Sequence, residues 1–593
     1  MIRYTNIPLP QTVVHYCQEF QIQDIVISAG SRNAPLTNGF VENPYFTTYS
    51  IVDERAAAFF ALGIAQQKQR PVALVCTSGS ALLNYYPAIA EAYYSDHPLV
   101  VLSADRMPHR IDIGDGQTIQ QQGVFGPHLE AAATLTPDVS HATKTLLENP
   151  SQQLLPPKAT SKQVAEKQAQ IQIQNEEEIC RVLSIAIRKM GPVHLNIPME
   201  EPLYGLTETP LRFKAKAIAV QPALDDIDDT YRTAWTKAQR KMILVGTQAP
   251  TPEVQALLQD LAKDPSVIVL TEVNGNIALK GHIYAIDTLM APLELEQESF
   301  YESLRPEILL TLGGMIVSKK IKAFLRQYPP HTHWHVHPKK AYNTFYCLSA
   351  HLQMPAGAFL RPLCTLPKSD SSNYQQLVVD RYNTYIERGQ RFLKGIPFSD
   401  LKVFKCLSHT LKGPLQVHFA NSSAIRYAQL FPLNHQVEVY CNRGTSGIDG
   451  STATAIGAAV AQQLPTVLVT GDLSFFYDIN GLWNNYIPKN FKIILINNAG
   501  GGIFRILPGE KDTPKYNTYF ETVHQRNAKY VAKAFGFRYY KLHTWRSLEG
   551  QLKNFLNTSS GPAILEVKTP RTQNDILLKK YFSQMAIEPK NNG

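Results

Sequence analysis

The chain has 593 residues, of which 44% are hydrophobic and 18% are charged. This composition provides apolar side chains for several buried cores and excludes wholesale disorder. The formal net charge of +9 is dilute over this length, so it does not indicate a nucleic-acid-binding stripe or a polybasic membrane anchor. The seven cysteines form no CxxC pair, which argues against a disulfide framework or a structural zinc site. No signal peptide and no apolar run of the ~18 residues that span a bilayer is recognised, so we expect a cytoplasmic α/β protein.

Short β-rich apolar runs alternate with longer helical stretches in the first third of the chain. Continuous runs such as VALVC and PLVVLSA are typical of parallel strands that are buried on both faces. Helical patterns at 54–67 and 81–95 separate such runs, and the alternation predicts βαβ units and a parallel sheet. The predicted strands are 24–28, 72–77, 99–103 and 193–198.

A polar stretch at residues 136–175 interrupts this pattern. It is rich in Gln, Ser, Pro and Lys, which predicts an exposed insertion or loop. A helix is predicted to begin at about Glu176 and to end at Gly191-Pro192, a typical C-terminal stop signal.

The same alternation begins again in the middle third and in the last third of the chain. It predicts three doubly wound parallel-sheet domains of α/β class, at residues 1–205, 206–370 and 371–593. The further predicted strands are 242–246, 267–271, 308–312, 333–337, 415–420, 437–441, 466–470, 492–496 and 563–567.

Two segments of the last third carry candidate metal ligands. In PTVLVTGDLSFF, Asp472 follows a strand, and in FKIILINNAGGGIF, Asn498 follows the next strand and precedes a glycine-rich turn. Parallel strands place their carboxyl ends at one edge of a sheet, so we expect Asp472, Asn498 and the Gly500 carbonyl to meet. These oxygen ligands suit Mg²⁺ or Ca²⁺, with further ligands from phosphates. The alternative for each segment alone is a helix N-cap or an ordinary turn.

This pair of segments resembles the diphosphate-binding motif of thiamine diphosphate (ThDP) enzymes. The resemblance implies Mg²⁺ or Mn²⁺ held by Asp472, Asn498 and Gly500. It also implies Glu54, in YSIVDERAAAFFALGIA, as the acid/base partner of the aminopyrimidine, and Ile448, in NRGTSGIDGSTAT, under the bent cofactor. Alone, Glu54 would be a first-turn helix residue and Ile448 a core residue. The implied cofactor-binding residues are Glu54, Ile448, Gly471, Asp472, Leu473, Ser474, Asn498, Gly500, Gly501, Ile503 and Phe504.

The motifs of the first domain, ISAGSRNAPL and the segment from TSGSALLNYYPAIAEAYYSDHPLVVLSADR to GVFG, resemble the ThDP enzymes of menaquinone biosynthesis. This subgroup decarboxylates 2-oxoglutarate and adds the product to isochorismate, both dicarboxylates. Guanidinium groups suit such substrates because they bind carboxylates bidentately. The resemblance implies the following catalytic and substrate-binding residues, with Glu54: Arg32, Arg106, Gln117, Arg426, Arg443, Ser422, Lys319 and Lys320.

The resemblance further implies a homodimer or dimer of dimers, with active sites at the subunit interface. The first and last domains are the expected pyrimidine- and diphosphate-binding domains, around a central α/β domain. Ala29 departs from the subgroup, which often has proline there. No nucleic acid and no membrane span are expected.

Two alternatives to this assignment remain open. One is another ThDP-dependent 2-oxoacid carboligase or decarboxylase, similar to acetolactate synthase, which would accept pyruvate. The other is a catalytically silent cofactor-binding protein of the same fold, which the presence of Glu54, Asp472 and Asn498 disfavours. Separately, the alternating histidines of HTHWHVH (331–337) share one face of a predicted strand, where a polar-faced or edge strand is the favoured interpretation over a metal site.

Overall fold

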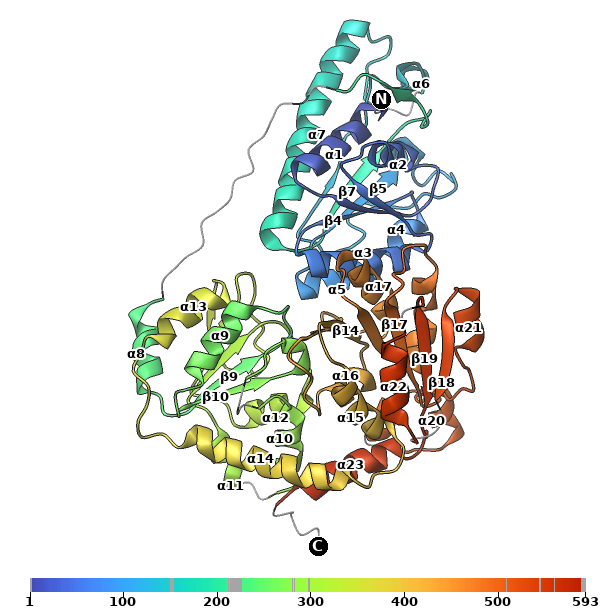
Figure 1. Cartoon of the computed structure of the whole chain (residues 1–593). Coiled ribbons are helices and arrows are strands. Elements are labelled where there is room, and N and C mark those ends of the chain that lie inside the picture. The colour runs from blue at the N-terminus through green and yellow to red at the C-terminus, as the bar shows by residue number, and fades with distance from the viewer. Residues whose placement is uncertain are drawn as a thin grey trace. The chain divides into compact units, whose positions relative to one another are not determined.

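The computed structural model describes residues 3–149, 154–211, 213, 227–279, 281, 283–296, 299–507, 509–542, 546–558 and 560–587 (Figure 1). The chain forms two compact units, each assembled from segments that are distant in sequence. Unit 1 comprises Met1–Val220, Gly444–Gln463 and Asp478–Pro488. Unit 2 comprises Gln221–Arg443, Leu464–Tyr477 and Lys489–Gly593.

Unit 1 is built on a parallel six-stranded sheet in the order β3-β2-β4-β5-β7-β6. The four inner strands are buried along their whole length, as the continuous apolar runs predict. The two edge strands were not predicted, because they are partly exposed and their sequences, TTYS and AAAT, lack the large apolar side chains of the inner strands. The strands are β2 (Asp24–Ile27), β3 (Thr47–Ser50), β4 (Val72–Cys76), β5 (Leu99–Asp105), β6 (Ala131–Thr134) and β7 (Val193–Pro198), with an antiparallel pair β1 (Tyr4–Thr5) and β8 (Leu206–Thr207).

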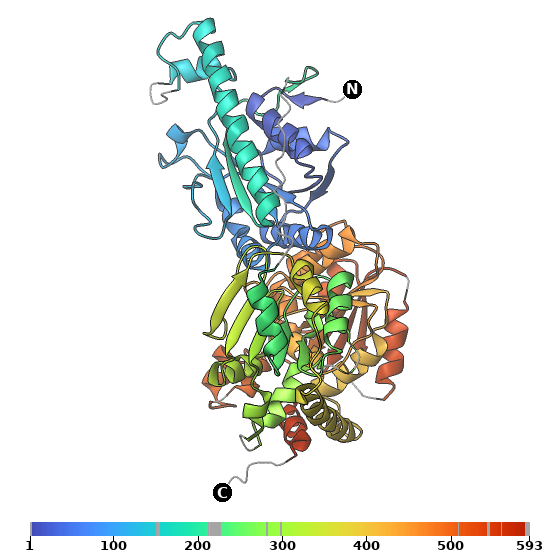
Figure 2. The same cartoon turned by 90° about the vertical axis from the view of Figure 1, so that its left-hand side faces the viewer.

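Helices cover this sheet, and the longest of them, α7, runs alongside it (Figure 2). The predicted helix 54–67 is confirmed as α3, whereas 81–95 divides into α4 and α5 at Tyr85. The helices of unit 1 are α1 (Pro8–Glu19), α2 (Ala34–Val41), α3 (Glu54–Lys68), α4 (Ser80–Asn84), α5 (Tyr86–Ser95), α6 (Thr143–Glu148), α7 (Ser161–Lys189) and α17 (Ser451–Ala461), with 3₁₀ turns η1 (Pro108–Arg110) and η3 (Ile479–Leu482).

The prediction of a loop over residues 136–175 is wrong at α6 and in its second half. Helix α7 begins at Ser161, so the predicted helix start at about Glu176 is also wrong. Thr160 and Gln163 form a capping box: Gln163 N–H donates to Thr160 Oγ1, and Thr160 N–H donates to Gln163 Oε1. Gln and Lys, two of the residue types on which the loop prediction rested, are also strong helix formers, as are the Glu and Ala residues among them. The predicted end is confirmed, since Met190 adopts a left-handed cap before Gly191. Residues 150–153 lie outside the described part of the chain.

Unit 2 contains two parallel sheets, ordered β10-β9-β11-β12-β13 and β15-β14-β16-β17-β19-β18. Every predicted strand of this unit is present within one residue at each end; β13 and β18, which lie at sheet edges, were not predicted. The strands are β9 (Lys241–Val245), β10 (Val267–Thr271), β11 (Ile308–Leu312), β12 (Thr332–Val336), β13 (Leu348–Leu352), β14 (Leu415–Phe419), β15 (Val437–Tyr440), β16 (Thr466–Gly471), β17 (Phe491–Asn497), β18 (Arg538–Leu542) and β19 (Ala563–Lys568).

One continuous apolar core joins the two sheets of unit 2. Helix α14 contributes to it by contacting α10 and β10 on one side and α23 on the other (Figure 1). The helices are α8 (Asp229–Lys237), α9 (Pro252–Leu261), α10 (Ile286–Leu293), α11 (Ser299–Leu304), α12 (Lys319–Gln327), α13 (Ala356–Cys364), α14 (Tyr374–Leu393), α15 (Asp400–Thr410), α16 (Ser423–Ala428), α18 (Asp472–Tyr477), α19 (Ile503–Ile506), α20 (Pro514–Tyr519), α21 (Lys529–Ala534), α22 (Leu548–Leu556) and α23 (Asn574–Met585), with η2 (Val273–Gly275).

The two six-stranded sheets have the same topology. If the strands of each sheet are numbered 1 to 6 along the chain, their order across the sheet is 2-1-3-4-6-5 in both. The order reverses between β2 and β4 in unit 1, and between β14 and β16 in unit 2. Such switch points leave a crevice at the carboxyl ends of the strands, where α/β proteins bind ligands. The three parallel-sheet domains confirm the predicted fold class.

The histidines of β12 lie on an inner strand between β11 and β13, not at a sheet edge. Thr311 Oγ1 lies 2.9 Å from His333 Nε2 and 2.7 Å from His335 Nδ1, so both rings have a polar neighbour. Within the described residues, no group of three or more His, Cys, Asp or Glu side chains is arranged to hold a metal. None of the helices in the described part of the chain has the length and apolar composition needed to cross a membrane.

Helices α3 and α17 of unit 1 pack at unusually short range. A Cβ atom at Gly457 would overlap the carbonyl oxygen of Phe60, and one at Gly63 would overlap the carbonyl oxygen of Thr454. Because the obstructing atoms are backbone, a side chain at either position would force the helices apart.

We therefore expect Gly457→Ala to lower the free energy of unfolding by about 1–3 kcal/mol, the usual cost of overpacking. Denaturant unfolding measures this change. The matched control is Gly550→Ala in α22, where a Cβ has open space and alanine adds about 0.5–1 kcal/mol through its higher helix propensity. Equal stability of the two variants would contradict the close approach of α3 and α17.

Candidate functional site

The two motif segments of the last third meet at the carboxyl edge of the second six-stranded sheet. Asp472 follows β16 and is 2% exposed, while Asn498 follows the neighbouring strand β17. Asp472 Oδ1 accepts a hydrogen bond from Leu473 N–H (2.7 Å), and Oδ2 accepts one from Gly500 N–H (3.0 Å). The predicted proximity of the Asp472 and Gly500 segments is therefore present in the structure.

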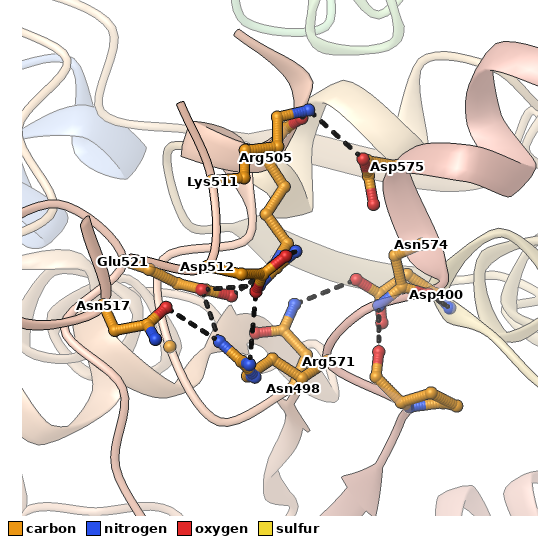
Figure 3. A network of polar contacts seen from close by, with 12 residues as sticks. Asp400, Asn498, Arg505, Lys511, Asp512, Asn517, Glu521, Arg571, Asn574 and Asp575 are labelled. Atoms are coloured by element: carbon orange, nitrogen blue, oxygen red, sulfur yellow. Dashed lines mark hydrogen bonds and ion pairs between the residues drawn. The ribbon is translucent and has the colours of Figure 1, made fainter. Parts of the chain in front are cut away.

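The amide of Asn498 is oriented by a carboxylate. Its Nδ2 donates to Asp400 Oδ2 at 3.0 Å (Figure 3). A carboxylate only accepts hydrogen bonds when ionised, so the NH₂ group must face Asp400 and the amide oxygen must point away from it. Among the described residues, no group donates to Asn498 Oδ1, and this oxygen is available to a ligand.

Backbone hydrogen bonds connect the glycine-rich turn after Asn498 to the segment around Glu521. Gly501 N–H donates to the Glu521 carbonyl (2.6 Å), and His524 N–H donates to the Ala499 carbonyl (3.2 Å). A Cβ at Gly500 would lie 2.6 Å from the same Glu521 oxygen, so this approach requires glycine. The backbone of the turn is thereby held in one shape.

A buried ion network holds Glu521 in place (Figure 3). The Arg505 guanidinium donates to both oxygens of the fully buried Glu521 carboxylate, at 2.6 and 3.0 Å. Arg571 Nη1 donates to Glu521 Oε2 at 2.6 Å, and Asp512 pairs with Arg505 from the solvent side. Bidentate geometry and burial make the Arg505 pair the strongest element of the network.

The donor set at this edge fits a divalent cation that also binds phosphate. It offers a carboxylate, an amide oxygen and a backbone carbonyl, which are the hard ligands that Mg²⁺ prefers. Burial raises the pKa of Asp400 to about 6, and the nearby Asp472 carboxylate adds to the rise. A cation beside two buried carboxylates relieves this repulsion. A Cβ at Gly471 would meet no atom within 4 Å, so space for a ligand adjoins Asp472.

His524 is a close neighbour of Asp472. Its Nδ1 accepts a hydrogen bond from Arg526 N–H (3.1 Å), so Nε2 is the ring nitrogen that can donate. Nε2 lies 3.4 Å from Asp472 Oδ2. Neither His524, nor Asp400, nor Glu521 was among the predicted site residues, because each reaches the motifs from a distant segment without a motif of its own.

In unit 1, Glu54 is the first residue of α3, after β3. Asp53 caps the helix, its Oδ1 accepting from Ala56 N–H (3.1 Å), so the Glu54 carboxylate is not needed as a cap. It accepts a long hydrogen bond from Asn84 Nδ2 at 3.4 Å. Ile448, also in unit 1, is 37% exposed, so its side chain is not part of the apolar core.

Arg32 and Arg106 lie at the carboxyl ends of β2 and β5 in unit 1. Arg32 is 5% exposed and donates to the Met199 carbonyl and to Glu201. Burial lowers the pKa of Arg32, and the positive charge of Arg106 lowers it further, so the two guanidinium groups are neighbours. Arg106 Nε donates to the Gly116 carbonyl (3.1 Å), next to the exposed Gln117.

A buried polar relay supports this end of the sheet. Gln121 accepts from Gly79 N–H (2.9 Å) and donates to Asn196 Oδ1 (2.7 Å). Asn196 donates to Asp105 Oδ2 (2.8 Å), whose other oxygen accepts from Arg106 N–H (2.8 Å). Sequence reasoning did not single out Asn196 or Asp105, since both fall inside strands that were recognised by their apolar neighbours.

A second arginine pair lies in unit 2. Burial lowers the pKa of Arg426 on α16; Asp287 raises it and Arg443 lowers it, so these charges are close together. Arg443 donates a hydrogen bond to Asn421 Oδ1 at 2.8 Å. Asn421 directly precedes the predicted substrate-binding residue Ser422.

The predicted lysines begin helix α12. Lys319 is exposed, and Lys320 pairs with Glu294. Lys322, which was not predicted, is the lysine whose pKa is lowered by burial and by Arg443 and Arg426. It therefore adds a positive charge to the arginine pair of unit 2.

Two known protein-family models match separate parts of this chain. The N-terminal TPP-binding domain of thiamine pyrophosphate enzymes matches residues 9–129, and the C-terminal TPP-binding domain of these enzymes matches residues 421–567. The fold, the matched domains and the oxygen-rich edge define an enzyme whose cofactor is thiamine diphosphate.

Relatives that match nearly the full length of the chain identify one family within this class of enzymes. The chain is 47% identical to the 2-succinyl-5-enolpyruvyl-6-hydroxy-3-cyclohexene-1-carboxylate (SEPHCHC) synthases of Christiangramia forsetii and Flavobacterium johnsoniae, over 98% of this chain and 100% of each relative. It is 35% identical to that of Porphyromonas gingivalis, over 96% of this chain and 95% of the relative. The chain belongs to the SEPHCHC synthase family of thiamine diphosphate enzymes.

We expect Glu521→Gln to loosen the glycine-rich turn, because the two arginines would lose their shared buried charge. Removing one partner of a buried pair costs about 3–5 kcal/mol. Hydrogen exchange should show faster exchange at residues 499–504, together with a lower melting temperature. Asp512→Asn is the control, since its half-exposed pair with Arg505 contributes at most about 1 kcal/mol. Unchanged exchange in Glu521→Gln would contradict the assigned role of the network.

Proposed function

We propose that this enzyme decarboxylates 2-oxoglutarate and joins the remaining four-carbon unit to the ring alkene of isochorismate. The products are SEPHCHC, which carries three carboxylates, and CO₂. One proton is taken up for each turnover, and neither an oxidant nor a reductant is needed. This places the chain in menaquinone biosynthesis.

The observation that carries the proposal is the presence of two arginine pairs, one in each unit. Arg32 with Arg106, and Arg426 with Arg443, are like charges held close together at least partly out of water. Glu201 pairs with Arg32, and Asp287 lies close to Arg426. A substrate carboxylate between the two arginines of a pair would add further favourable charged hydrogen bonds. Both substrates are dicarboxylates, whereas the pyruvate used by an acetolactate synthase-like enzyme carries one carboxylate and needs fewer cations.

Further residues take distinct roles. Thiamine diphosphate supplies a carbon nucleophile and an electron sink when bound. Asp472, Asn498 and the Gly500 carbonyl would hold Mg²⁺ or Mn²⁺ at its diphosphate, beside Gly471, Leu473, Ser474, Gly501, Ile503 and Phe504. Glu54 would exchange a proton with the aminopyrimidine, and Ile448 would support the bent cofactor. Gln117, Ser422, Lys319 and Lys320 would orient substrate carboxylates.

We further propose that the enzyme is a homodimer located in the cytoplasm. Residues 1–205 would form the pyrimidine-binding domain and 371–593 the diphosphate-binding domain, each completing a site with a second copy of the chain. Exposed apolar side chains near the glycine-rich turn, among them Tyr519, Phe520 and Val523, support such a homodimer. We place the enzyme in the cytoplasm, where its seven free thiols stay reduced.

Incubation of the purified chain with thiamine diphosphate, Mg²⁺, 2-oxoglutarate and isochorismate tests the reaction. We expect equimolar consumption of both substrates and release of CO₂. Chromatography and mass spectrometry measure these changes. Glu54→Gln serves as the blank, because the amide cannot exchange the proton; it should retain thiamine diphosphate binding. Turnover of pyruvate in place of 2-oxoglutarate would instead support the acetolactate synthase-like alternative.

Arg426→Ala tests the cationic pocket of unit 2. A hydrogen bond to a charged group contributes about 1.5–3 kcal/mol, so kcat/KM for at least one dicarboxylate should fall about 10- to 150-fold. Steady-state kinetics with each substrate varied in turn measures the change. Arg391→Ala on the exposed face of α14 is the matched control and should leave kcat/KM unaltered. If Arg426→Ala behaves like this control toward both substrates, the pocket assignment is wrong.

A further inference from the structure

Asp400 joins three segments of unit 2 that are far apart in the sequence. It is the first residue of α15 and is 2% exposed. Its Oδ2 accepts from Asn498 Nδ2 at the end of β17 (3.0 Å), and its Oδ1 accepts from Thr569 Oγ1 at the end of β19 (2.6 Å). Both oxygens are therefore occupied by side chains that follow neighbouring strands of the sheet.

A common role for an acidic residue at this position is to stabilise the helix N-terminus. Here Ser399 is the cap, since its Oγ accepts from Lys402 N–H (3.4 Å). None of the hydrogen bonds found for the Asp400 carboxylate in the described structure comes from the backbone of α15. The carboxylate is thus directed at Asn498 and Thr569 instead of at its own helix.

The backbone of Asp400 is anchored as well. Its N–H donates to Asn574 Oδ1 (2.9 Å), and Asn574 Nδ2 donates in turn to the Pro570 carbonyl (2.9 Å). Figure 3 shows Asp400 between Asn574 and Asn498. Anchored at its backbone and at both carboxylate oxygens, and shielded from water, Asp400 has little freedom to move.

This rigidity has a consequence for Asn498. An asparagine amide can present either its oxygen or its NH₂ group after a half-turn of the side chain, and the two orientations differ little in shape. Turning the oxygen toward Asp400 would place it against a carboxylate oxygen, with no hydrogen between them. The orientation with Nδ2 on Asp400 is the one that leaves Oδ1 free as a cation ligand.

We propose that Asp400 is a positioning residue that locks the Asn498 amide with its oxygen directed toward the cation of the diphosphate site. The proposal rests on the metal site described under the proposed function. It assigns to Asp400 no contact with substrate or cofactor. Partners of this kind, which orient a ligand from behind, typically contribute 10- to 100-fold to metal affinity.

Manganese titration in the presence of saturating thiamine diphosphate tests the proposal without recourse to turnover. The electron paramagnetic resonance signal of free Mn²⁺ reports how much of the metal is bound. We expect Asp400→Ala to raise the Mn²⁺ dissociation constant by about 10- to 100-fold. Asp400→Asn should stay within about threefold of the unsubstituted chain, since its amide can keep an oxygen toward Asn498 and turn its NH₂ group toward the Thr569 hydroxyl.

Asp138 of unit 1 provides a matched control. It is also a buried carboxylate, accepting from Leu9 N–H and from Gln168 Nε2, both at 2.7 Å. Asp138→Ala should lower the melting temperature and leave the Mn²⁺ affinity unchanged. Loss of affinity in Asp138→Ala equal to that in Asp400→Ala would show a general effect of destabilisation and overturn the proposal.

The outcomes separate this inference from the metal site itself. If the unsubstituted chain binds no thiamine diphosphate-dependent Mn²⁺, or Asn498→Ala binds it equally well, the proposed site fails. If Asn498→Ala weakens binding while Asp400→Ala stays within twofold of the unsubstituted chain, only the role of Asp400 fails. Equal losses in Asp400→Asn and Asp400→Ala would also overturn it, because the hydrogen-bond acceptor would then not matter.

Thr569→Val keeps the test decisive should Asp400→Ala fail to fold. It removes the hydroxyl that anchors Asp400 Oδ1 and leaves the carboxylate itself in place. We expect a severalfold weaker Mn²⁺ affinity, smaller than the effect expected for Asp400→Ala. An unchanged affinity in a folded Thr569→Val chain would overturn the proposal, because the anchor of Asp400 would then not matter for the cation.

Discussion

The structure depends on the burial of parallel strands on both faces. A strand such as β4 carries only apolar side chains on its two buried faces, so many of the polar groups collect where the strands end. Because parallel strands all end at the same edge, Asp472, Asn498 and the glycine-rich turn come together there. The same constraint brings Arg32, Arg106 and the turn at Gly79 to one end of the sheet in unit 1. Chemistry at these edges follows from the way the cores are built.

Like charges lie close together at these carboxyl ends of the strands. Burial and Asp472 together raise the pKa of Asp400. Burial lowers the pKa of Arg32 and of Arg426, and the neighbouring arginine of each lowers it further. In contrast, Glu521 is buried with two arginines and is fully compensated within the chain. Like charges that the protein leaves adjacent indicate where an external cation or anion completes the structure, whereas compensated charges indicate scaffolding.

Sequence reasoning was most accurate where the signal is local. Continuous apolar runs predicted the buried strands closely, because such runs need no knowledge of the partner strands. It failed for partly exposed edge strands such as β3 and β18, which lack such runs, and for the first half of α7. There, the content of Gln, Ser, Pro and Lys was interpreted as a loop, although the capping box at Thr160 and the buried Val164 and Ile171 favour a helix.

The sequence by itself determined the class of fold and the segments that form most of the buried strands, and it predicted the motif residues Glu54, Asp472 and Asn498. It could do so because each of these depends on side chains within a few residues of one another. Only the tertiary structure decided that Asp400 faces Asn498, that Glu521 clips the glycine-rich turn, and that Lys322 joins the charges around Arg426. These contacts join segments tens of residues apart, and their geometry is decided by how the strands and helices pack, which no local pattern encodes.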